Sequence, residues 1–534
     1  MRGDMKQYSV LLFFAFIVPI LVFAQTNTPK IEWYKIYDGP GHGVDLTNDI
    51  VMDQSNNIYL AGRSAGRDSS QDLLILKYSF TGDSLLELRY LSALHSWDEA
   101  DWIAVDSESN IYVVGQSTFE QTSPYAIFHK YSADGALLWA RDFHDNININ
   151  SEGVQVVLNS KGEPIIGYNQ TAAKIAKYST SGDSLWTVPI QDDTSSYQVQ
   201  YIAIDKDDNI YAALLQSFWA GGDLPVTKVV LLKITQSGVP LWRRQFAETK
   251  AKKIVFDKET NPILLLSDTI IMKCDLEGDT LWTRQYPEVG DIVITTDLVI
   301  DSNDNIVFTG YGLGSDSWDY FTQKLSSAGK DVWTSVFNSD EHLDDYAFSV
   351  ALDKSDNIYV TGGSHNSGPS GLCYTLKYSS AGDLQWQMKF DAPRSNYETG
   401  KSIFVDDSDN VYVGGEVADT ANGWNFLALK IRQDVSAGIE EVKNNMPTAF
   451  TLSQNYPNPC NPSTVISYQL PTNTLVTLKV YDELGRIVRT LVEERQAAGT
   501  HSVTFNASNL SSGMYFYRLT AGIFVQTKKL MLLR

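Results

Sequence analysis

Residues 353–363 read DKSDNIYVTGG, and close copies of this phrase occur at 205–211 (DKDDNIY), 301–306 (DSNDNI) and 406–412 (DDSDNVY). Its first position falls at Asp53, Asp106, Asn159, Asp205, Asp257, Asp301, Asp353 and Asp406. Consecutive copies therefore begin 44 to 53 residues apart. A steady period of this length is typical of a chain built from structural repeats, and it outranks any local interpretation of the same residues.

Acidic residues at alternate positions also occur in calcium-binding loops, so two interpretations of the phrase compete. A calcium loop brings together about six oxygens and usually has a Gly at its sharp bend and a bidentate Glu further along. The phrase has neither, and its fifth residue, Asn in seven of the eight copies, leads directly into an apolar stretch. Asp and Asn favour tight turns by local hydrogen bonding and by tolerating left-handed backbone, so we predict a hairpin turn. We predict no metal site and no cofactor, and leave open a bound cation such as calcium.

Each repeat reads as four short strands separated by turn residues. In the second repeat the strands are WIAVD, NIYVVGQS, YAIFHKYS and LLWARDF, all within residues 102–143. Four strands in about 50 residues are typical of one blade of a β-propeller. A single blade cannot bury both of its faces, so neighbouring blades must stack against it.

The two ends of the repeat region complement each other. The last repeat stops after NFLALKIRQ (425–433) and lacks the strand that carries a Trp in other repeats, whereas IEWYKIYDG (31–39), with Trp33, precedes the first repeat. We therefore predict an all-β fold in which an eight-bladed β-propeller spans 31–433 and is closed by an N-terminal strand. The repeated Trp is expected to pack between blades. A repeated Lys is expected to lie solvated at a strand end, at Lys77, Lys130 and Lys377.

The connections on the two faces of such a propeller differ. One face has short, uniform turns, and the other has long, dissimilar loops, which is where recognition usually lies. At the mouth of the first strand in four neighbouring repeats, eight positions before the turn residue, stand Asp45, Asp98, Asp345 and Glu398. Aromatic residues flank them at Trp97, Tyr346 and Tyr397. These seven side chains are the candidate ligand-binding site.

Three interpretations of this site remain open. An acidic arc with aromatic rings would suit a cation, a sugar or a basic peptide. Two of the carboxylates could instead cleave a glycosidic bond as acid and base or nucleophile, which requires a suitable separation of their oxygens. The arc could also be a solvated rim without a ligand. No individual catalytic residue is predicted.

The overall charge and the remaining motifs exclude several classes of protein. With 64 acidic and 42 basic residues the chain carries a net charge of −22, which opposes binding to nucleic acid or to an anionic membrane surface. The seven His residues show no metal-ligand spacing, and the three Cys residues form neither a disulfide framework nor a ligand set. There is no nucleophile elbow and no phosphate-binding loop.

The amino terminus has the pattern of a secretory signal. Arg2 and Lys6 precede an apolar run from Val10 to Phe23. The run is too short to span a bilayer, so we predict a signal peptide over 1–24, with cleavage between Ala24 and Gln25. No later segment is apolar enough to cross a membrane, so we predict no transmembrane segment in the mature chain.

Two parts of the chain resemble known families. The phrases quoted above resemble the β-propeller repeats of exported bacterial proteins, over about 31–433. A linker, 434–447, then leads to NYPNPCNPST, VYDELGR, AAGTH, LSSGMYFYRL and KKLMLLR. These motifs closely resemble the type A C-terminal sorting domain of type IX secretion cargo, although Cys460 stands where that family generally has an aromatic residue. Alternating short strands over 448–534 also read as a small immunoglobulin-like sandwich.

The second resemblance implies a route and partners. It implies passage through the periplasm, translocation across the outer membrane by the type IX secretion machinery, and removal of 448–534 by a sortase. The protein would then be extracellular or held at the cell surface. The predicted function is a binding module that uses the loop-rich face for a glycan or protein ligand. The alternatives are a hydrolase or lyase that acts on polysaccharide through the mouth carboxylates, and a purely structural element.

Overall fold

The structure is a computed structural model, and it divides into two compact units between Val435 and Ser436. Described residues run from 29 to 532, apart from 68–69, 93–96, 119–123, 145–151, 222–224, 248–249, 268, 287–292, 315–316, 340–342, 366–370, 394, 420–422, 434–449, 456–457, 459–461, 472–473, 497–498, 509 and 523. The predicted signal peptide with its cleavage site at Ala24 and Gln25, and the predicted linker, lie outside the described residues.

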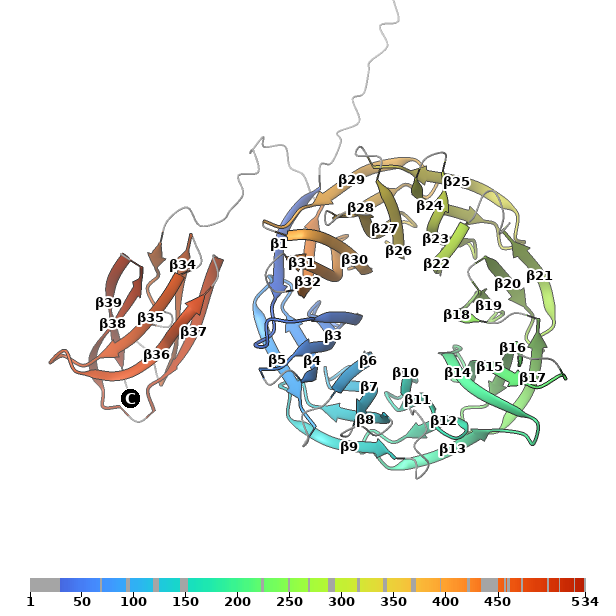
Figure 1. Ribbon diagram of the computed structural model, residues 1–534, viewed down its shortest axis with the longest axis horizontal. Coiled ribbons are helices and arrows are strands. Elements are labelled where there is room, and N and C mark those ends of the chain that lie inside the picture. Colours follow the sequence, from blue (N-terminus) through green and yellow to red (C-terminus); the bar gives the residue numbers. More distant parts are fainter. Residues whose placement is uncertain are drawn as a thin grey trace, which may run out of the picture. The chain divides into compact units, whose positions relative to one another are not determined.

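The first unit is a ring of β-sheets (Figure 1). One sheet contains β2 (Leu46–Met52), β3 (Ile58–Ala65), β4 (Gln71–Tyr78), β5 (Ser84–Tyr90), β6 (Trp97–Val105), β7 (Ile111–Thr118), β8 (Tyr125–Tyr131) and β9 (Leu137–Phe143). A single parallel bridge between Gln71 and Trp97 joins β4 to β6, and the other strand pairs of this sheet are antiparallel.

Five further sheets each contain four consecutive antiparallel strands. The first two are formed by β10 (Glu152–Leu158), β11 (Pro164–Asn169), β12 (Ala173–Tyr178) and β13 (Ser184–Ile190), and by β14 (Ser195–Ile204), β15 (Ile210–Phe218), β16 (Val226–Ile234) and β17 (Pro240–Phe246). The third contains β18 (Ala251–Phe256), β19 (Pro262–Leu266), β20 (Ile270–Cys274) and β21 (Thr280–Gln285). The fourth contains β22 (Val293–Ile300), β23 (Ile306–Leu313), β24 (Trp318–Leu325) and β25 (Asp331–Phe337). The fifth contains β26 (Asp344–Leu352), β27 (Ile358–His365), β28 (Gly371–Tyr378) and β29 (Leu384–Phe390).

The last sheet of the ring combines both ends of the repeat region. It contains β30 (Ser395–Val405), β31 (Val411–Asp419), β32 (Gly423–Arg432) and β1 (Lys30–Tyr37). In each set of four strands the first lies innermost in the ring and the last lies at the rim (Figure 1). The second and third strands are almost fully buried, as in β11 and β19, because neighbouring sheets cover both of their faces.

The repeated phrase forms the predicted hairpin turn between first and second strands. In the first copy, Oδ1 of Asp53 accepts hydrogen bonds from the backbone N–H groups of Ser55 and Asn57, both at 2.9 Å. Asn56 has a φ of 59°, in the left-handed region that the turn requires. The equivalent bonds of Asp353 measure 2.8 and 2.9 Å. The turn oxygens are therefore used to order their own backbone.

Neighbouring sheets are joined through the repeated Trp and Lys. Nε1 of Trp139 donates to the carbonyl oxygen of Thr180 in the next sheet at 3.1 Å, and Nζ of Lys130 donates to the same oxygen at 3.1 Å. The indole also lies on Gly182, where a Cβ would come within 2.8 Å of the ring. Lys130 is 5% exposed and lies 3.8 Å from the turn carboxylate of Asp106. The predicted packing role of the Trp is confirmed.

The prediction that the repeated Lys is a solvated strand end is wrong. Lys77 is 7% exposed, lies 3.8 Å from Asp53, and its ammonium stands over the ring of Tyr59 at 4.8 Å. Lys377 is likewise held near Asp353 at 3.8 Å. A buried ammonium is tolerated here because a carboxylate, an aromatic face and acceptor oxygens replace its water shell.

The predicted closure of the ring is confirmed by the pairing of β1 with β32. Trp33 lies opposite Lys430, and both side chains donate to the carbonyl oxygen of Phe80 in the first sheet, at 3.1 and 2.9 Å. Trp33 also covers Gly82 as the other indoles cover their glycines. At the opposite end, the Gln433 amide oxygen accepts hydrogen bonds from Trp386 at 3.2 Å and from Lys377 at 2.8 Å. It thereby replaces the turn that the last repeat lacks.

The second unit consists of two sheets with a common core. One contains β33 (Thr451–Leu452), β34 (Ser463–Leu470) and β37 (Gly499–Asn506), and the other contains β36 (Ile487–Gln496), β35 (Thr474–Tyr481), β38 (Gly513–Ala521) and β39 (Phe524–Leu532). Alternate residues of β34 and β35 are buried, and they pack together with Tyr517 and Leu530. The Tyr517 hydroxyl donates to the carbonyl of Ser453 at 2.8 Å and accepts from the N–H of Asn455 at 2.8 Å.

We expect Trp33→Ala to destabilise the first unit by about 3 kcal/mol, because it removes aromatic packing and a hydrogen bond at the point of closure. The change should appear as a lower Tm in calorimetry. Ile36→Ala, on the same strand at a side chain that is 38% exposed, is the matched control and should change the Tm little. Equal effects of both substitutions would contradict the assigned role of Trp33.

Candidate functional site

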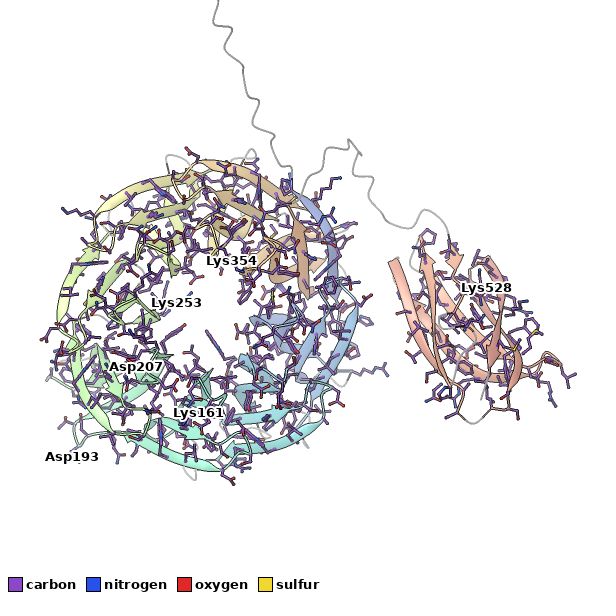
Figure 2. All side chains as sticks on the ribbon, turned by 180° about the vertical axis from the view of Figure 1, so that it is seen from behind. Lys161, Asp193, Asp207, Lys253, Lys354 and Lys528 are labelled. Atoms are coloured by element: carbon purple, nitrogen blue, oxygen red, sulfur yellow. The ribbon has the colours of Figure 1, made fainter. Side chains whose placement is uncertain are left out.

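The innermost strands share one irregularity that shapes the centre of the ring. Each contains a β-bulge, with register shifts between Thr47 and Asp49, Ala100 and Trp102, Gly153 and Gln155, Val199 and Tyr201, Ala251 and Lys253, Thr295 and Asp297, Ala347 and Ser349, and Gly400 and Ser402. The residues just after the bulges are mostly polar. Lys253, one of them, lies on the inner side of the ring (Figure 2).

Several of these polar side chains connect neighbouring innermost strands. Asp49 accepts a hydrogen bond from the N–H of Ile103 at 3.0 Å, and Gln155 accepts one from the N–H of Ile202 at 2.7 Å. Asp297 receives the ammonium of Lys253 at 2.5 Å and the N–H of Val350 at 3.0 Å. Burial raises the pKa of Asp49 to about 7. These side chains therefore connect the innermost strands of neighbouring sets.

The four predicted mouth acids are buried and engaged with backbone. Asp45, Asp98 and Asp345 are each 0% exposed, and Glu398 is 1% exposed. Each accepts the N–H of the residue six positions earlier: Gly39 at 2.7 Å, Ser92 at 2.7 Å, Ser339 at 2.7 Å and Ala392 at 3.1 Å. The acidic arc expected from the sequence is therefore not an open surface, because each carboxylate fixes the segment that leads into its own strand.

Burial changes the protonation of these acids. It raises the pKa values of Asp45, Asp98 and Asp345 above their ordinary range, although hydrogen bonds to the carboxylates act in the opposite direction. The effect is largest at Glu398, where burial raises the pKa to about 7. The part of these four residues in ligand binding stays a prediction.

Trp97 lies in a separate cluster on the second set of strands. Its side chain is 40% exposed, its Nε1 donates to Oε2 of Glu99 at 3.1 Å, and the guanidinium of Arg63 lies 4.4 Å from its ring centroid. Arg63 also pairs with Glu99 at 2.8 Å. These contacts fix the orientation of the exposed indole, whereas Nε of Arg63 is buried without a hydrogen-bond partner among the described residues.

The other two predicted aromatics, Tyr346 and Tyr397, belong to a continuous row of rings, which we call the aromatic row. Its members are Tyr311, Trp318, Tyr346, His365, Tyr397 and Trp424. They stand at the ends of β23, β24, β26, β27, β30 and β32, on the side of the long loops. All six side chains are partly exposed.

Each ring of the aromatic row contacts the next, and the row crosses three neighbouring sheets. The centroid of Tyr311 lies 5.6 Å from that of Trp318 and 4.7 Å from that of Tyr346. His365 lies between Tyr346, at 4.8 Å, and Tyr397, at 4.9 Å. Trp424 then meets Tyr397 at 4.8 Å, with the two ring planes inclined by 73°. Contacts of this kind stabilise the orientation of each ring.

Backbone and polar contacts hold the row in place. Gly371, opposite His365 on β28, lies so close to the Tyr397 ring that a Cβ would come within 2.7 Å of it. The N–H of Trp318 donates to Asp344 at 3.1 Å. The row is therefore a rigid feature built on strand ends.

Sequence reasoning singled out Tyr346 and Tyr397, but it did not join them with Tyr311, Trp318, His365 and Trp424 in one site. The rings do not share a repeat position: Tyr346 and Tyr397 stand at different distances from the turn residues of their sheets, Asp353 and Asp406. A repeat alignment therefore does not bring them together. The only available signal was the density of aromatic residues in three successive repeats.

A cavity among the innermost strands is a further candidate for a ligand site. An apolar cavity of about 430 Å³ is lined by Val51, Met52, Trp102, Ile103, Ala104, Val105, Val156, Leu158 and Phe404. The indole N–H of Trp102 is the single polar side-chain group of this lining, so the cavity offers little to orient a ligand. In the described ranges, no group of three or more His, Cys, Asp or Glu side chains is arranged to hold a metal ion.

Comparisons with known proteins identify the second unit and the fold of the first. Residues 454–533 match the family model of the secretion system C-terminal sorting domain. The chain is similar in structure to the quinohemoprotein alcohol dehydrogenase ADHIIG from Pseudomonas putida HK5, with 10% identity, 81% of this chain and 79% of that chain covered, and a TM-score of 0.50. It is also similar to the Dos1 propeller, with 8% identity, coverage of 75% and 95%, and a TM-score of 0.50. Curated protein sequences give no match.

The structural likenesses show the fold alone, because the identities are so low. Fold and tail together define an exported β-propeller protein. The chain is a propeller protein that carries a type IX secretion system C-terminal sorting domain, and this domain directs it to the cell surface or the extracellular space. No helix that could cross a membrane occurs among the described residues.

The buried carboxyl of Glu398 predicts a pH-dependent stability. Its folded-state pKa of about 7 lies above the ordinary 4.5, so between these values the folded protein binds more protons than the unfolded chain. The stabilising contribution is complete below about pH 4.5 and is lost as the pH rises through about 7. Relative to Glu398→Gln, the wild type should therefore lose free energy of unfolding across this window in urea titrations.

The matched control is Asp407→Asn, at a carboxyl whose side chain is 82% accessible. It should leave the pH dependence of unfolding unchanged. A difference between the wild type and Glu398→Gln that is constant from pH 4.5 to 7.5 would contradict the assigned burial of this carboxyl.

Proposed function

We propose that the chain is a secreted binding module with four parts: a signal peptide over 1–24 cleaved between Ala24 and Gln25, an eight-bladed propeller over 31–433, a linker over 434–447 and an immunoglobulin-like sorting domain over 448–534. The blade number is supported by the single bridge between Gln71 and Trp97, which joins two sets of four strands into the eight-stranded sheet. Six four-stranded sheets accompany that sheet in the ring.

The route to the surface follows from the sorting domain. The chain enters the periplasm, is translocated across the outer membrane by the type IX machinery, and loses residues 448–534 to a sortase. Because the two units have separate hydrophobic cores, the propeller does not depend on the tail for its packing.

The propeller binds its ligand through the loop-rich face, at the aromatic row. The observation that carries this proposal is the continuity of six partly exposed rings over three sheets. Rigid scaffolds with varied loops commonly carry recognition sites, and apolar aromatic surface left in contact with water marks a place where a ligand gains free energy by covering it.

Binding is favoured over catalysis by the state of the mouth acids. Most retaining and inverting glycosidases place two carboxyl groups on either side of the scissile bond, where both must reach the substrate. Asp98, Asp345 and Glu398 are buried and hydrogen-bonded to backbone instead. The alternative, a polysaccharide hydrolase or lyase acting through these acids, therefore has less support.

A chain that ends at residue 447 should fold normally and accumulate in the periplasm of the producing cell, because it lacks the domain that the secretion machinery handles. Cell fractionation with an antibody against the propeller measures this. Its Tm should match that of the secreted form. Appearance of the shortened chain in the medium at wild-type levels would refute the proposed route.

Binding should depend on the aromatic row. We expect fluorescently labelled full-length protein to be retained on extracellular material from cultures of the producing organism, and the variant Trp318→Ala/Tyr397→Ala to lose at least tenfold in retention. The matched control is Trp219→Ala, which removes a Trp that is 68% exposed and lies outside the row. Equal retention of all three proteins, with unchanged circular dichroism, would refute the proposed site.

A further inference from the structure

We propose that the aromatic row binds a chain of uncharged sugar residues, an inference that rests on the proposed function and names its ligand class. The row is elongated, since its rings follow one another from Tyr311 on β23 to Trp424 on β32. A compact ligand would cover one or two of these rings, whereas a polymer with repeated flat units can cover them all. The length of the row thus favours a chain-like ligand.

Sugar rings match the chemistry of the row in two ways. Their C–H faces are apolar and pack against aromatic rings, and their hydroxyl groups require hydrogen-bond partners when they leave water. The row supplies both, because Tyr346 and Tyr397 combine an aromatic face with a phenolic hydroxyl. Neither hydroxyl hydrogen-bonds to another described residue, so both remain available to a ligand.

The charges beside the row argue against a cationic ligand. The carboxylates that flank it already have partners: Asp344 accepts the N–H of Trp318 at 3.1 Å, and Glu416 lies 3.8 Å from the ammonium of Lys401. Asp345 and Glu398 are buried beneath the surface. Only one of these two flanking carboxylates, that of Asp344, therefore lacks a cation beside it among the described residues. A basic peptide would depend on this single charge and on cation–π attraction, which is modest at an exposed site, about 0.5–1 kcal/mol.

Anionic polymers are disfavoured as well. The whole chain carries a net charge of −22, so nucleic acids and acidic polysaccharides meet long-range repulsion. Lys401, on the same strand as Tyr397, directs its ammonium to Glu416 at 3.8 Å and to the face of Phe348, 4.7 Å from that ring centroid. A neutral polysaccharide needs no counter-charge and avoids the repulsion.

Affinity electrophoresis of the full chain in native gels tests this inference. The gels contain one soluble polysaccharide each: laminarin, xyloglucan, galactomannan or the acidic polygalacturonate, and a further gel contains poly-L-lysine. We expect at least one neutral polysaccharide to retard the wild type, with a dissociation constant raised at least tenfold in Trp318→Ala/Tyr397→Ala. Trp219→Ala should migrate as the wild type does. Binding should also change the emission of Trp318 and Trp424.

Two subtler variants keep the test meaningful if the double variant folds poorly. Tyr397→Phe keeps the ring and removes the hydroxyl, and should weaken binding several-fold. Gly371→Ala places a methyl group against the Tyr397 ring without removing any aromatic residue, and should weaken binding while sparing the Tm of the second unit. Wild-type affinity in both variants would overturn the inference.

The outcomes separate the two proposals. Retardation by polygalacturonate or poly-L-lysine alone, or by none of the probes, overturns the sugar assignment. If retention on extracellular material still depends on the aromatic row in that case, the proposed binding function stands and only its ligand class is wrong. If that retention is also independent of the row, both proposals fail.

Discussion

One carbonyl oxygen at the turn between third and fourth strands links most neighbouring sets of strands in the ring. The indole of the preceding set donates to it, and at Thr180, Ser327, Ser380 and Phe80 the ammonium of a buried Lys donates to it as well. The turn needs a Gly such as Gly182 with positive φ, and because that Gly has no Cβ the indole can lie directly on it. A single oxygen thus connects a turn, an indole and an ammonium, and the charge of the Lys130 ammonium is balanced by the nearby carboxylate of Asp106.

Because this contact recurs between neighbouring sheets, closing the ring requires a donor from one end of the repeat region and an acceptor oxygen from the other. Trp33 provides the indole of the last sheet and reaches Phe80, while Gln433 provides an amide oxygen in place of the missing turn. The two residues are separated by the whole propeller in sequence. Closure thus pairs strands from opposite ends of the repeat region, and contacts of such large sequence separation slow folding.

The repeat period, the hairpin turns and the closing strand could be predicted from the sequence, because each depends on residues whose spacing is fixed by the strand and turn geometry. The roles of polar side chains could not. Lys77 reads as a surface residue until its partner Asp53, many residues earlier, is seen beside it. The sequence suggests an open acidic mouth at Asp345 and Glu398, because it does not reveal that their carboxylates accept hydrogen bonds from the N–H groups of Ser339 and Ala392. The aromatic row could not be predicted for a related reason. Its members stand at different positions within successive repeats, so an alignment of the repeats does not place them side by side.

One seam of the ring departs from the common design. In the first set of strands Leu86 stands where the other sets carry an indole, and it packs on Gly135 of the next set without donating a hydrogen bond. The backbone bridge between Gln71 and Trp97 crosses this same seam at the opposite face. Other side chains donate across this seam instead: Nδ2 of Asn48 and the guanidinium of Arg63 both donate to Glu99, at 2.7 and 2.8 Å, and the Ser109 hydroxyl donates to Asp53 at 3.1 Å. The ring therefore stays continuous where the repeated indole is absent, because polar side chains elsewhere on the two sets of strands take over the connection.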